Sequence, residues 1–322
     1  MKAFQVTAHD APPRLHDIAI DAPAIGEVQL AVEACGLNFA DLLQSKGQYQ
    51  ERRPLPVTLG MEFAGTVIAH GPGAEAPPIG SRVAVFAGAG GLAERANVPA
   101  ERCIPLPAGM PFTDAAGFMV AYGTSHLALT RRARLAPGET LLVLGAAGGV
   151  GLTAVEVGKA LGARVIACAR GRDKLEIARR AGADHLIESE TEDLREAVLA
   201  LGGADVVYDP VGGALFDAAL RACRPEARIL AIGFASGTVP QIKANHLLVK
   251  NVTVEGFYWG GYATFAPALL DGSLATLFEW YAQDRLRPHV GDVLPLARAG
   301  EGLELLRSRR AVGKVVVTCG TE

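Results

Sequence analysis

The sequence predicts an α/β protein that combines a β-rich first third with a doubly wound parallel sheet. Three observations lead to this prediction. Short apolar runs in the first third are separated by clusters of glycine and proline. From about Pro137 onward, continuous apolar runs alternate with segments of helical spacing. The 322 residues also suffice for two domains of ordinary size or for one large α/β domain.

The first third is expected to form a barrel-like set of strands joined by turns. The predicted strands are the apolar runs Val28–Val32, Ala64–Ile68 and Arg82–Phe86. Turn-forming clusters separate them, including GPG at 71–73 and PPIG at 77–80.

The second part begins with a strand, a glycine-rich turn and an amphipathic helix. Leu141–Leu144 is a continuous apolar run, as expected for a parallel strand buried on both faces. After the turn, apolar residues recur at helical spacing on one face, namely Val150, Ala154, Val157 and Leu161. The alternation then continues, with strands predicted at Arg164–Ala169, Asp205–Tyr208 and Arg228–Ile232 and helices at Lys174–Ala181 and Ala214–Cys223. From about Gly256 the pattern becomes mixed again and ends in a predicted strand, Lys314–Thr318.

The composition indicates a core-forming protein without a nucleic-acid or membrane partner. Half of the residues are hydrophobic, a fifth are charged, and the formal net charge is −3, without long basic runs. The five cysteines are widely spaced and form no C-x-x-C motif, which argues against disulfides and cysteine metal sites and favours a reducing compartment. The beginning of the chain, MKAFQVTAHD, lacks an apolar leader, so a cytoplasmic location is expected.

The glycine-rich turn is the main candidate for a cofactor site. The sequence LLVLGAAGGVGLTAVEVGKALGA places Gly145, Gly148, Gly149 and Gly151 between a strand and a helix, with Val150 among the expected cofactor-binding residues. A tight turn that lets the backbone approach a pyrophosphate needs missing side chains, and the helix N-terminus offers free N–H groups. We therefore expect dinucleotide binding, with a purely structural turn as the alternative. A nucleotide-hydrolase loop is excluded, because Leu152 and Thr153 stand where that motif needs Lys and Ser/Thr.

The end of the second predicted strand favours NADPH over NADH. An NAD site places a carboxylate there, about 20 residues past the glycine loop, to bond the ribose hydroxyls. The chain has Ala169 and Arg170 at this point, followed by Arg172 and Lys174. A guanidinium pairs with a 2′-phosphate, which a carboxylate would repel. Asp173 is interpreted as a helix cap. The alternative is that these basic residues form only the solvated start of a helix.

Ordered motifs extend over nearly the whole chain: ACGLNFADLLQSKGQY at 34–49, PLPVTLGMEFAGTV at 54–67, AYGTSHLAL at 121–129, GAAGGVG at 145–151, DVVYDPVGG at 205–213, GF at 233–234 and GKVVV at 313–317. Together they resemble the medium-chain dehydrogenase/reductase superfamily, and within it the quinone oxidoreductase (zeta-crystallin-like) branch. The resemblance implies a GroES-like β-barrel catalytic domain, residues 1–120 and 257–322, and a Rossmann NADPH-binding domain, residues 121–256. The cofactor is then expected between these domains.

The resemblance also implies that the protein works without zinc. The first zinc-binding Cys of the related alcohol dehydrogenases falls at Asn38, and their zinc-binding His falls at Met61. Neither residue is a good zinc ligand, although Glu62 remains. The cysteine-rich structural zinc lobe that should follow Val83 is replaced by FAGAGGLAERANV.

Hydride transfer from NADPH to a quinone is therefore the expected activity. Without a Lewis acid, alcohol oxidation would lose the metal that stabilises an alkoxide. A conjugated acceptor instead delocalises the developing anion itself, so positioning and a few hydrogen bonds suffice. The main alternative is a reductase of α,β-unsaturated carbonyls, either enals and enones or enoyl thioesters. A second alternative is a non-enzymatic protein that binds NADPH or RNA.

By motif match, three residues are expected to act on the substrate. Asn38 should lie beside the nicotinamide, where it bonds a substrate oxygen or the carboxamide; Tyr49 resembles the tyrosine of the family's cleft; and Thr124 resembles a threonine near the nicotinamide. The alternatives are a loop Asn bonded to its own backbone, a packing Tyr, and a Thr bonded to its own helix. Asp41 is expected to brace the barrel loop.

Further cofactor residues are expected at the carboxyl edge of the sheet and in the tail. Gly233 and Phe234 follow a strand there, where open α/β sheets bind ligands. Arg309, Arg310 and Lys314 resemble tail positions that approach the cofactor in this branch, and at least one of these three is expected to be only a solvated surface residue.

The remaining expectations concern the acceptor pocket, the cofactor affinity and the assembly. Phe257–Trp259 either line the acceptor pocket or belong to the core between the domains. Ser189 stands where the family often has a Tyr that helps to hold the 2′-phosphate. The resemblance also suggests a homodimer that pairs the edge strands Asn251–Glu255.

Overall fold

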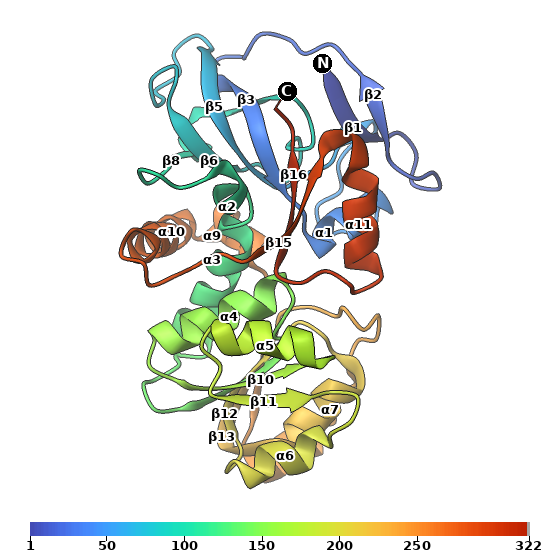
Figure 1. Ribbon diagram of the computed structural model, residues 1–322, viewed down its shortest axis with the longest axis vertical. Coiled ribbons are helices and arrows are strands. Elements are labelled where there is room, and N and C mark those ends of the chain that lie inside the picture. Colours follow the sequence, from blue (N-terminus) through green and yellow to red (C-terminus); the bar gives the residue numbers. More distant parts are fainter. Residues whose placement is uncertain (321–322) are drawn as a thin grey trace. The chain divides into compact units, whose positions relative to one another are not determined.

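The structure is a computed structural model that describes residues 1–320, and it consists of two compact units. The first unit contains Met1–Val120 together with the described residues from Pro288 onward, and the second contains Ala121–Arg287. Figure 1 shows both units coloured along the chain. The division expected from the sequence has its second boundary after residue 256, whereas residues 257–287 lie in the second unit.

Residues 257–287 belong to the second unit because their buried side chains pack on helix α3 (Met119–Leu127). A Cβ atom added at Gly123 would lie only 2.6 Å from the indole Nε1 of Trp259, so the helix and the ring are in close contact. Farther along the helix, Nδ1 of His126 lies 2.8 Å from the hydroxyl of Ser273. Both contacts are buried, and they fix the segment within this unit.

The first unit is built from two sheets. A small sheet has the order β2-β1-β4, and a larger one has the order β15-β16-β3-β5-β6-β8, with β7 also paired to β3. The bounds are β1 Lys2–Val6, β2 Arg14–Asp17, β3 Glu27–Gly36, β4 Val57–Thr58, β5 Glu62–His70, β6 Arg82–Phe86, β7 Arg95–Pro99, β8 Cys103–Pro105, β15 Val290–Pro295 and β16 Lys314–Thr318. The helices are α1 Phe39–Ser45, α2 Phe112–Ala116 and α11 Ala299–Arg307. Apolar residues of β3, β5, β6 and β16 form the core of this unit.

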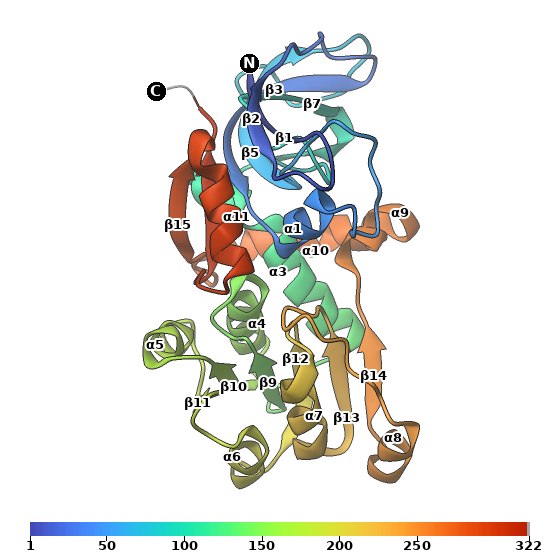
Figure 2. The same ribbon diagram turned by 90° about the vertical axis from the view of Figure 1, so that its right-hand side faces the viewer.

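The second unit contains a parallel sheet of the order β11-β10-β9-β12-β13-β14. In chain order this is 3-2-1-4-5-6, the strand order of the Rossmann fold. The strands are β9 Thr140–Leu144, β10 Arg164–Ala169, β11 His185–Glu188, β12 Ala204–Asp209, β13 Cys223–Ala231 and β14 Thr253–Gly256. The remaining α-helices are α4 Gly149–Ala160, α5 Arg172–Arg180, α6 Leu194–Ala200, α7 Gly213–Ala222, α8 Ala244–Lys250, α9 Tyr262–Phe265 and α10 Pro267–Ala282. Figure 2 shows β14 beside β13 at the end of this sheet.

The packing of α4 against β9 holds the glycine loop between these two elements in place. All five residues of β9 are buried, as expected for a central parallel strand with both faces covered. Helix α4 packs close to this strand at Gly158, where a Cβ would lie 2.5 Å from Leu141 Cδ2. The glycine loop is thereby held at the carboxyl end of β9. Within residues 1–320, no helix is long and apolar enough to cross a membrane.

Candidate active site

The glycine loop connects β9 to α4 at the carboxyl edge of the parallel sheet. Gly145 ends the strand with a φ of +61°, a conformation that favours glycine. Gly148 caps the helix, whose first turn contains Gly149 and Val150. A Cβ added at Gly151 would lie 2.2 Å from the carbonyl oxygen of Gly145, so the helix turn and the loop touch through their backbones. The loop residues Gly145, Gly148, Gly149 and Val150 are half-buried and therefore accessible to a ligand.

This loop has the form that a pyrophosphate needs. The first turn of a helix leaves backbone N–H groups without intrahelical partners, and the helix dipole adds partial positive charge. The missing side chains let an anion approach these groups. The sheet also changes winding direction between β9 and β12, the place where doubly wound sheets bind ligands. The residues present therefore fit a dinucleotide.

Basic residues gather where β10 ends. The Arg170 side chain is 48% exposed, and its Nη1 lies 3.6 Å from a carboxylate oxygen of Glu190. Burial lowers the pKa of Lys174, and the positive charge of Arg170 lowers it further. Arg170 and Lys174 thus place two positive charges close together, and a bound phosphate group would lower the repulsion between them. The predicted cap residue Asp173 lies in the first turn of α5, whereas Gly171 occupies the N-cap position.

A second loop at the same edge follows β13. Gly233 is half-buried and its N–H donates to the carbonyl of Asp209 at 3.3 Å, and Phe234 is 41% exposed. The Asp209 carboxylate is buried and accepts the N–H groups of Val211 and Gly212 at 2.7 and 2.8 Å. Its role is thus to hold the β12 turn, and burial raises its pKa. The structure places Gly233 and Phe234 at the carboxyl edge, as the sequence predicts.

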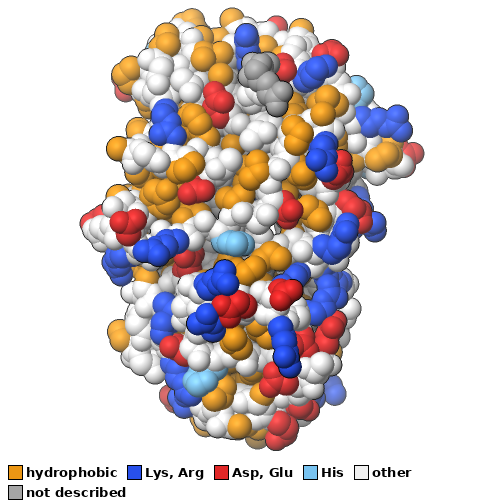
Figure 3. All heavy atoms as spheres, viewed as in Figure 1, with side chains coloured by type: hydrophobic (Ala, Val, Ile, Leu, Met, Phe, Trp, Pro, Cys, Tyr) orange, Lys and Arg blue, Asp and Glu red, His pale blue; other side chains and the backbone are white. Residues whose placement is uncertain are grey.

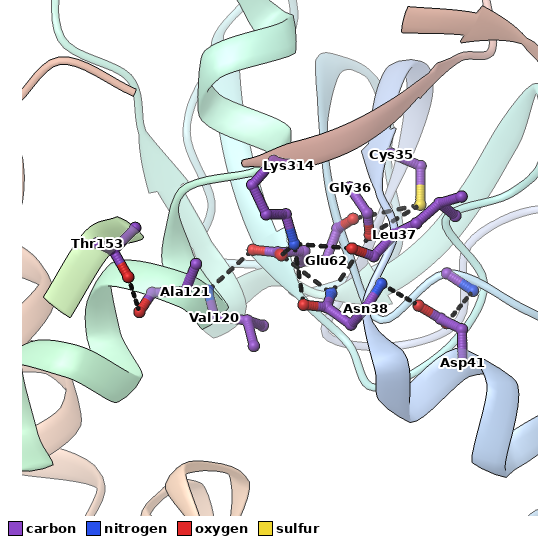
Figure 4. Close-up of polar contacts among 11 residues, drawn as sticks. Cys35, Gly36, Leu37, Asn38, Asp41, Glu62, Val120, Ala121, Thr153 and Lys314 are labelled. Carbon is purple, nitrogen blue, oxygen red and sulfur yellow. Dashed lines mark hydrogen bonds and ion pairs between the residues drawn. The ribbon is translucent and has the colours of Figure 1, made fainter. Parts of the chain in front are cut away.

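In the first unit, Asn38 belongs to a buried polar centre with Glu62 and Lys314 (Figure 4). The Lys314 ammonium donates to Glu62 Oε1 at 2.7 Å, to Asn38 Oδ1 at 2.9 Å and to the Leu37 carbonyl at 2.9 Å. Asn38 Nδ2 donates to Glu62 Oε1 at 3.0 Å and to the Gly36 carbonyl at 3.3 Å. The side chains of Glu62 and Lys314 are 0% and 8% exposed. Lys314 is therefore buried, and of the three tail residues named from the sequence it is Arg309 and Arg310 that are exposed.

Asp41 holds the loop that carries Asn38. One carboxylate oxygen accepts the backbone N–H of Asn38 at 2.8 Å, and the other accepts the N–H of Gly60 at 3.0 Å. Burial raises the pKa of Asp41 to about 6. Asn38 is at the same time the N-cap of α1. The predicted bracing role of Asp41 agrees with these contacts.

The other predicted residues lie on separate elements. Thr124 is buried in α3, and no hydrogen bond of its hydroxyl occurs among the described residues, so the alternative of bonding its own helix is not realised. Tyr49 is half-buried in the loop after α1. Arg309 is exposed, with a φ of +57°, between α11 and β16. Thr124 lies in the unit that holds the glycine loop, and Tyr49 and Arg309 lie in the unit that holds Asn38.

The aromatic segment after β14 is mainly core. Phe257 and Trp259 are 9% and 4% exposed, whereas Tyr258 is 37% exposed. Phe257 also contacts the Tyr262 ring, with 5.5 Å between the centroids. Of the three residues, Tyr258 is thus the one with a surface to offer a ligand.

Sequence reasoning missed a buried carboxylate, Glu156 on α4. Its Oε2 accepts a short hydrogen bond from the Tyr122 hydroxyl, and its Oε1 accepts the Arg287 N–H at 3.0 Å. Tyr122 lies two positions before Thr124, so the contact ties α3 to α4. The available signal was one acidic residue in an otherwise apolar helical stretch. Burial raises the pKa of Glu156 from its ordinary value of 4.5 to about 7.

The substitution Glu156→Gln is expected to make the stability less dependent on pH. Because the folded-state pKa is raised, the wild-type protein loses stability as the pH rises from about 4.5 to about 7, and the loss is complete above that range. The difference between the two pKa values corresponds to on the order of 3 kcal/mol. Glutamine can still accept the Arg287 N–H and donate to Tyr122. Urea unfolding at mildly acidic and mildly alkaline pH measures the effect; parallel curves for both proteins would contradict it.

The described residues contain no group of three or more His, Cys, Asp or Glu side chains that could hold a metal ion. At the positions that the sequence resemblance assigns to zinc ligands, the chain has Asn38 and buried Met61, and the neighbouring Glu62 forms a buried ion pair with Lys314.

Comparisons with known proteins agree with this arrangement. The alcohol dehydrogenase GroES-like domain model matches residues 24–108, and the zinc-binding dehydrogenase model matches residues 149–272. The Bos taurus quinone oxidoreductase-like protein 2 is 39% identical over 91% of this chain and 85% of its own length. The human synaptic vesicle membrane protein VAT-1 homolog is 33% identical over 94% of this chain and 81% of its own.

Two solved structures extend the comparison. The quinone oxidoreductase from Thermus thermophilus, also solved with NADPH, is 36% identical, has a TM-score of 0.88 and covers 99% of this chain with 100% of its own. The Escherichia coli quinone oxidoreductase complexed with NADPH is 29% identical, with a TM-score of 0.90 and the same coverage.

Proposed function

The chain belongs to the quinone oxidoreductase branch of the medium-chain dehydrogenase/reductase superfamily, and from this we propose that it is a zinc-independent enzyme that reduces a quinone with NADPH. The observation that carries the cofactor part is the glycine loop at the switch point of the sheet, with Arg170 and Lys174 at the end of the next strand. The relatives named as quinone oxidoreductases support the acceptor part.

When bound, NADPH supplies the hydride. The backbone N–H groups of the first turn of α4 bind the pyrophosphate, and Arg170 and Lys174 pair with the 2′-phosphate. Gly233 and Phe234 at the carboxyl edge of the sheet are proposed as further cofactor contacts, and Arg309 is proposed as one on the family resemblance. Tyr49 and Thr124 have hydroxyl groups that can donate to the oxygen on which negative charge develops.

Asn38 serves as an acceptor. Both Nδ2 hydrogens bond within the first unit, to Glu62 and to the Gly36 carbonyl, so the side chain does not donate to a substrate oxygen. Oδ1 receives the Lys314 ammonium, and the capping box of α1 also directs the Asp41 N–H to this side chain. Oδ1 is thus an acceptor, and as an acceptor it suits an N–H of the nicotinamide carboxamide. Of the two roles expected from the sequence, we propose the contact with the carboxamide.

A panel of acceptors tests the activity. Metal-chelated protein is mixed with NADPH and, in parallel, with quinones and with enals, enones and enoyl thioesters, while the loss of NADPH absorbance is followed. Turnover confined to quinones supports the proposal. Turnover mainly with unsaturated carbonyls would assign the enzyme to that alternative substrate class. Silence on both panels, with NADPH still bound, would favour a non-enzymatic role.

The distribution of charge on the surface is also compatible with a small-molecule substrate. On the face shown in Figure 3, basic and acidic side chains are interspersed, without the continuous basic stripe that nucleic-acid binding requires. All five cysteines are buried and unpaired, which suits a reducing compartment such as the cytoplasm.

We further propose a homodimer that pairs β14 with its copy. Strand β14 is the last of its sheet, and the preceding helix α8 exposes Leu248 and Val249 by 77% and 76%. Sedimentation at micromolar concentration should give twice the chain mass of 33.6 kDa; a monomer would contradict the pairing.

A further inference from the structure

The Lys314 ammonium lies in a complete cage of oxygen atoms. Its three N–H groups match its three acceptors, Glu62 Oε1, Asn38 Oδ1 and the Leu37 carbonyl, at 2.7 to 2.9 Å. These acceptors come from β5 and from the loop after β3, whereas Lys314 begins β16. A buried lysine charge with every hydrogen bonded has one position and one orientation. The cation therefore joins three chain segments at one point.

This cage determines how the Asn38 amide is turned. An ammonium only donates hydrogen bonds, so the side chain must offer it the carbonyl oxygen. A carboxylate only accepts them, so Glu62 must receive the Nδ2 group. Turning the amide over would place two donors together and two acceptors together in a buried site. The ion pair thus fixes the direction in which Oδ1 points.

The same carboxylate reaches the beginning of α3. Glu62 Oε2 accepts the backbone N–H of Val120 at 2.8 Å, and the neighbouring Ala121 carbonyl accepts the Thr153 hydroxyl at 3.0 Å (Figure 4). The helix that starts here carries Thr124. A disturbance of the ion pair therefore affects two of the proposed active-site residues through their backbones and hydrogen bonds.

We propose that Lys314 is a positioning residue for hydride transfer, whose internal ammonium orients Asn38 and Glu62 as a metal ion would orient its ligands. This inference rests on the proposed contact of Asn38 with the cofactor. Stability alone does not require a charged pair in this place, because a neutral pair of similar shape often serves equally well in a buried site. Folding and positioning can therefore be separated by experiment.

The test compares single and double variants. Lys314→Met leaves Glu62 buried without its cation and is expected to be strongly destabilised. Lys314→Met combined with Glu62→Gln removes both charges, and the glutamine carbonyl still accepts the Val120 N–H. This double variant should recover most of the unfolding temperature lost in Lys314→Met, yet its single-turnover hydride transfer at saturating NADPH should be slower by about tenfold or more. Its NADPH dissociation constant should stay within about twofold of wild type.

Two controls make the outcome specific. Lys159→Met with Asp184→Asn removes a lysine ion pair of 2.9 Å in the second unit and should leave the rate unchanged. Asn38→Ala should slow the wild-type enzyme but add little in the double variant, because coupled residues are not additive. Wild-type rates in the folded double variant, or full additivity with Asn38→Ala, would overturn the inference. If the proposed function were at fault, the wild-type protein itself would show no turnover.

Discussion

Gly151→Ala is expected to remove most of the affinity for NADPH. The added Cβ would lie 2.2 Å from the Gly145 carbonyl oxygen and 3.0 Å from the Ala146 Cα, and both atoms are backbone. No side-chain rotation relieves this contact, so the loop must move away from the first turn of α4. Overpacking of this kind costs about 1–3 kcal/mol, and here it falls on the N–H groups that we propose bind the pyrophosphate. The dissociation constant should rise by roughly 5- to 150-fold.

A matched glycine variant separates this effect from a general loss of helix quality. Gly272→Ala changes a glycine in α10 around which a Cβ would meet nothing within 4 Å. It should stabilise the protein by up to about 1 kcal/mol, because alanine favours a helix over glycine. NADPH fluorescence titration then measures binding by both variants, and thermal unfolding shows that both are folded. Binding by Gly151→Ala within about threefold of wild type would show that the loop does not hold the pyrophosphate.

The sequence predicted the parts of this site whose signals are local. The apolar run of β9, the glycines and the helical spacing of α4 occupy consecutive positions, so one stretch of chain predicts strand, turn and helix together. The contact between the buried charges of this site has no such local signal in the sequence. Lys314 and Glu62 are 252 positions apart, and nothing near either residue shows that they meet. The family position in the tail therefore did not show that Lys314 is buried in an ion pair with Glu62.

The segment 257–287 shows a second limit of sequence reasoning. Helix α10 is apolar around much of its circumference, so its pattern does not show a single buried face. Its place is determined by distant contacts such as that between Ser273 and His126, which are 147 positions apart. Contacts of this kind arise from three-dimensional packing, and only the structure assigns the segment to the second unit.

Arg170→Asp is expected to weaken the binding of NADPH far more than that of NADH. The two cofactors differ by the 2′-phosphate, and the substitution replaces an attractive charge by a repulsive one at the end of β10. The Arg170 side chain is 48% exposed and lies 3.6 Å from Glu190, so solvent and this carboxylate screen part of the effect. A cost on the order of 2–3 kcal/mol remains, which corresponds to roughly 30- to 150-fold in the NADPH dissociation constant. For NADH the change should stay within about threefold.

A charge-matched variant and the salt dependence of binding show whether the effect of Arg170→Asp comes from a local contact with the 2′-phosphate or only from the change in net charge. Arg195→Asp makes the same change of charge on α6, at an arginine paired with Glu196, and should alter neither dissociation constant. In the wild-type protein, added salt should narrow the gap between NADPH and NADH, because the arginine is exposed enough to be screened. In the Arg170→Asp variant, salt screens the repulsion between the introduced carboxylate and the 2′-phosphate. Added salt should therefore weaken NADPH binding less in this variant than in the wild-type protein. Equal weakening of both cofactors by Arg170→Asp would mean that the 2′-phosphate is bound elsewhere, since only a charge beside that phosphate distinguishes the two.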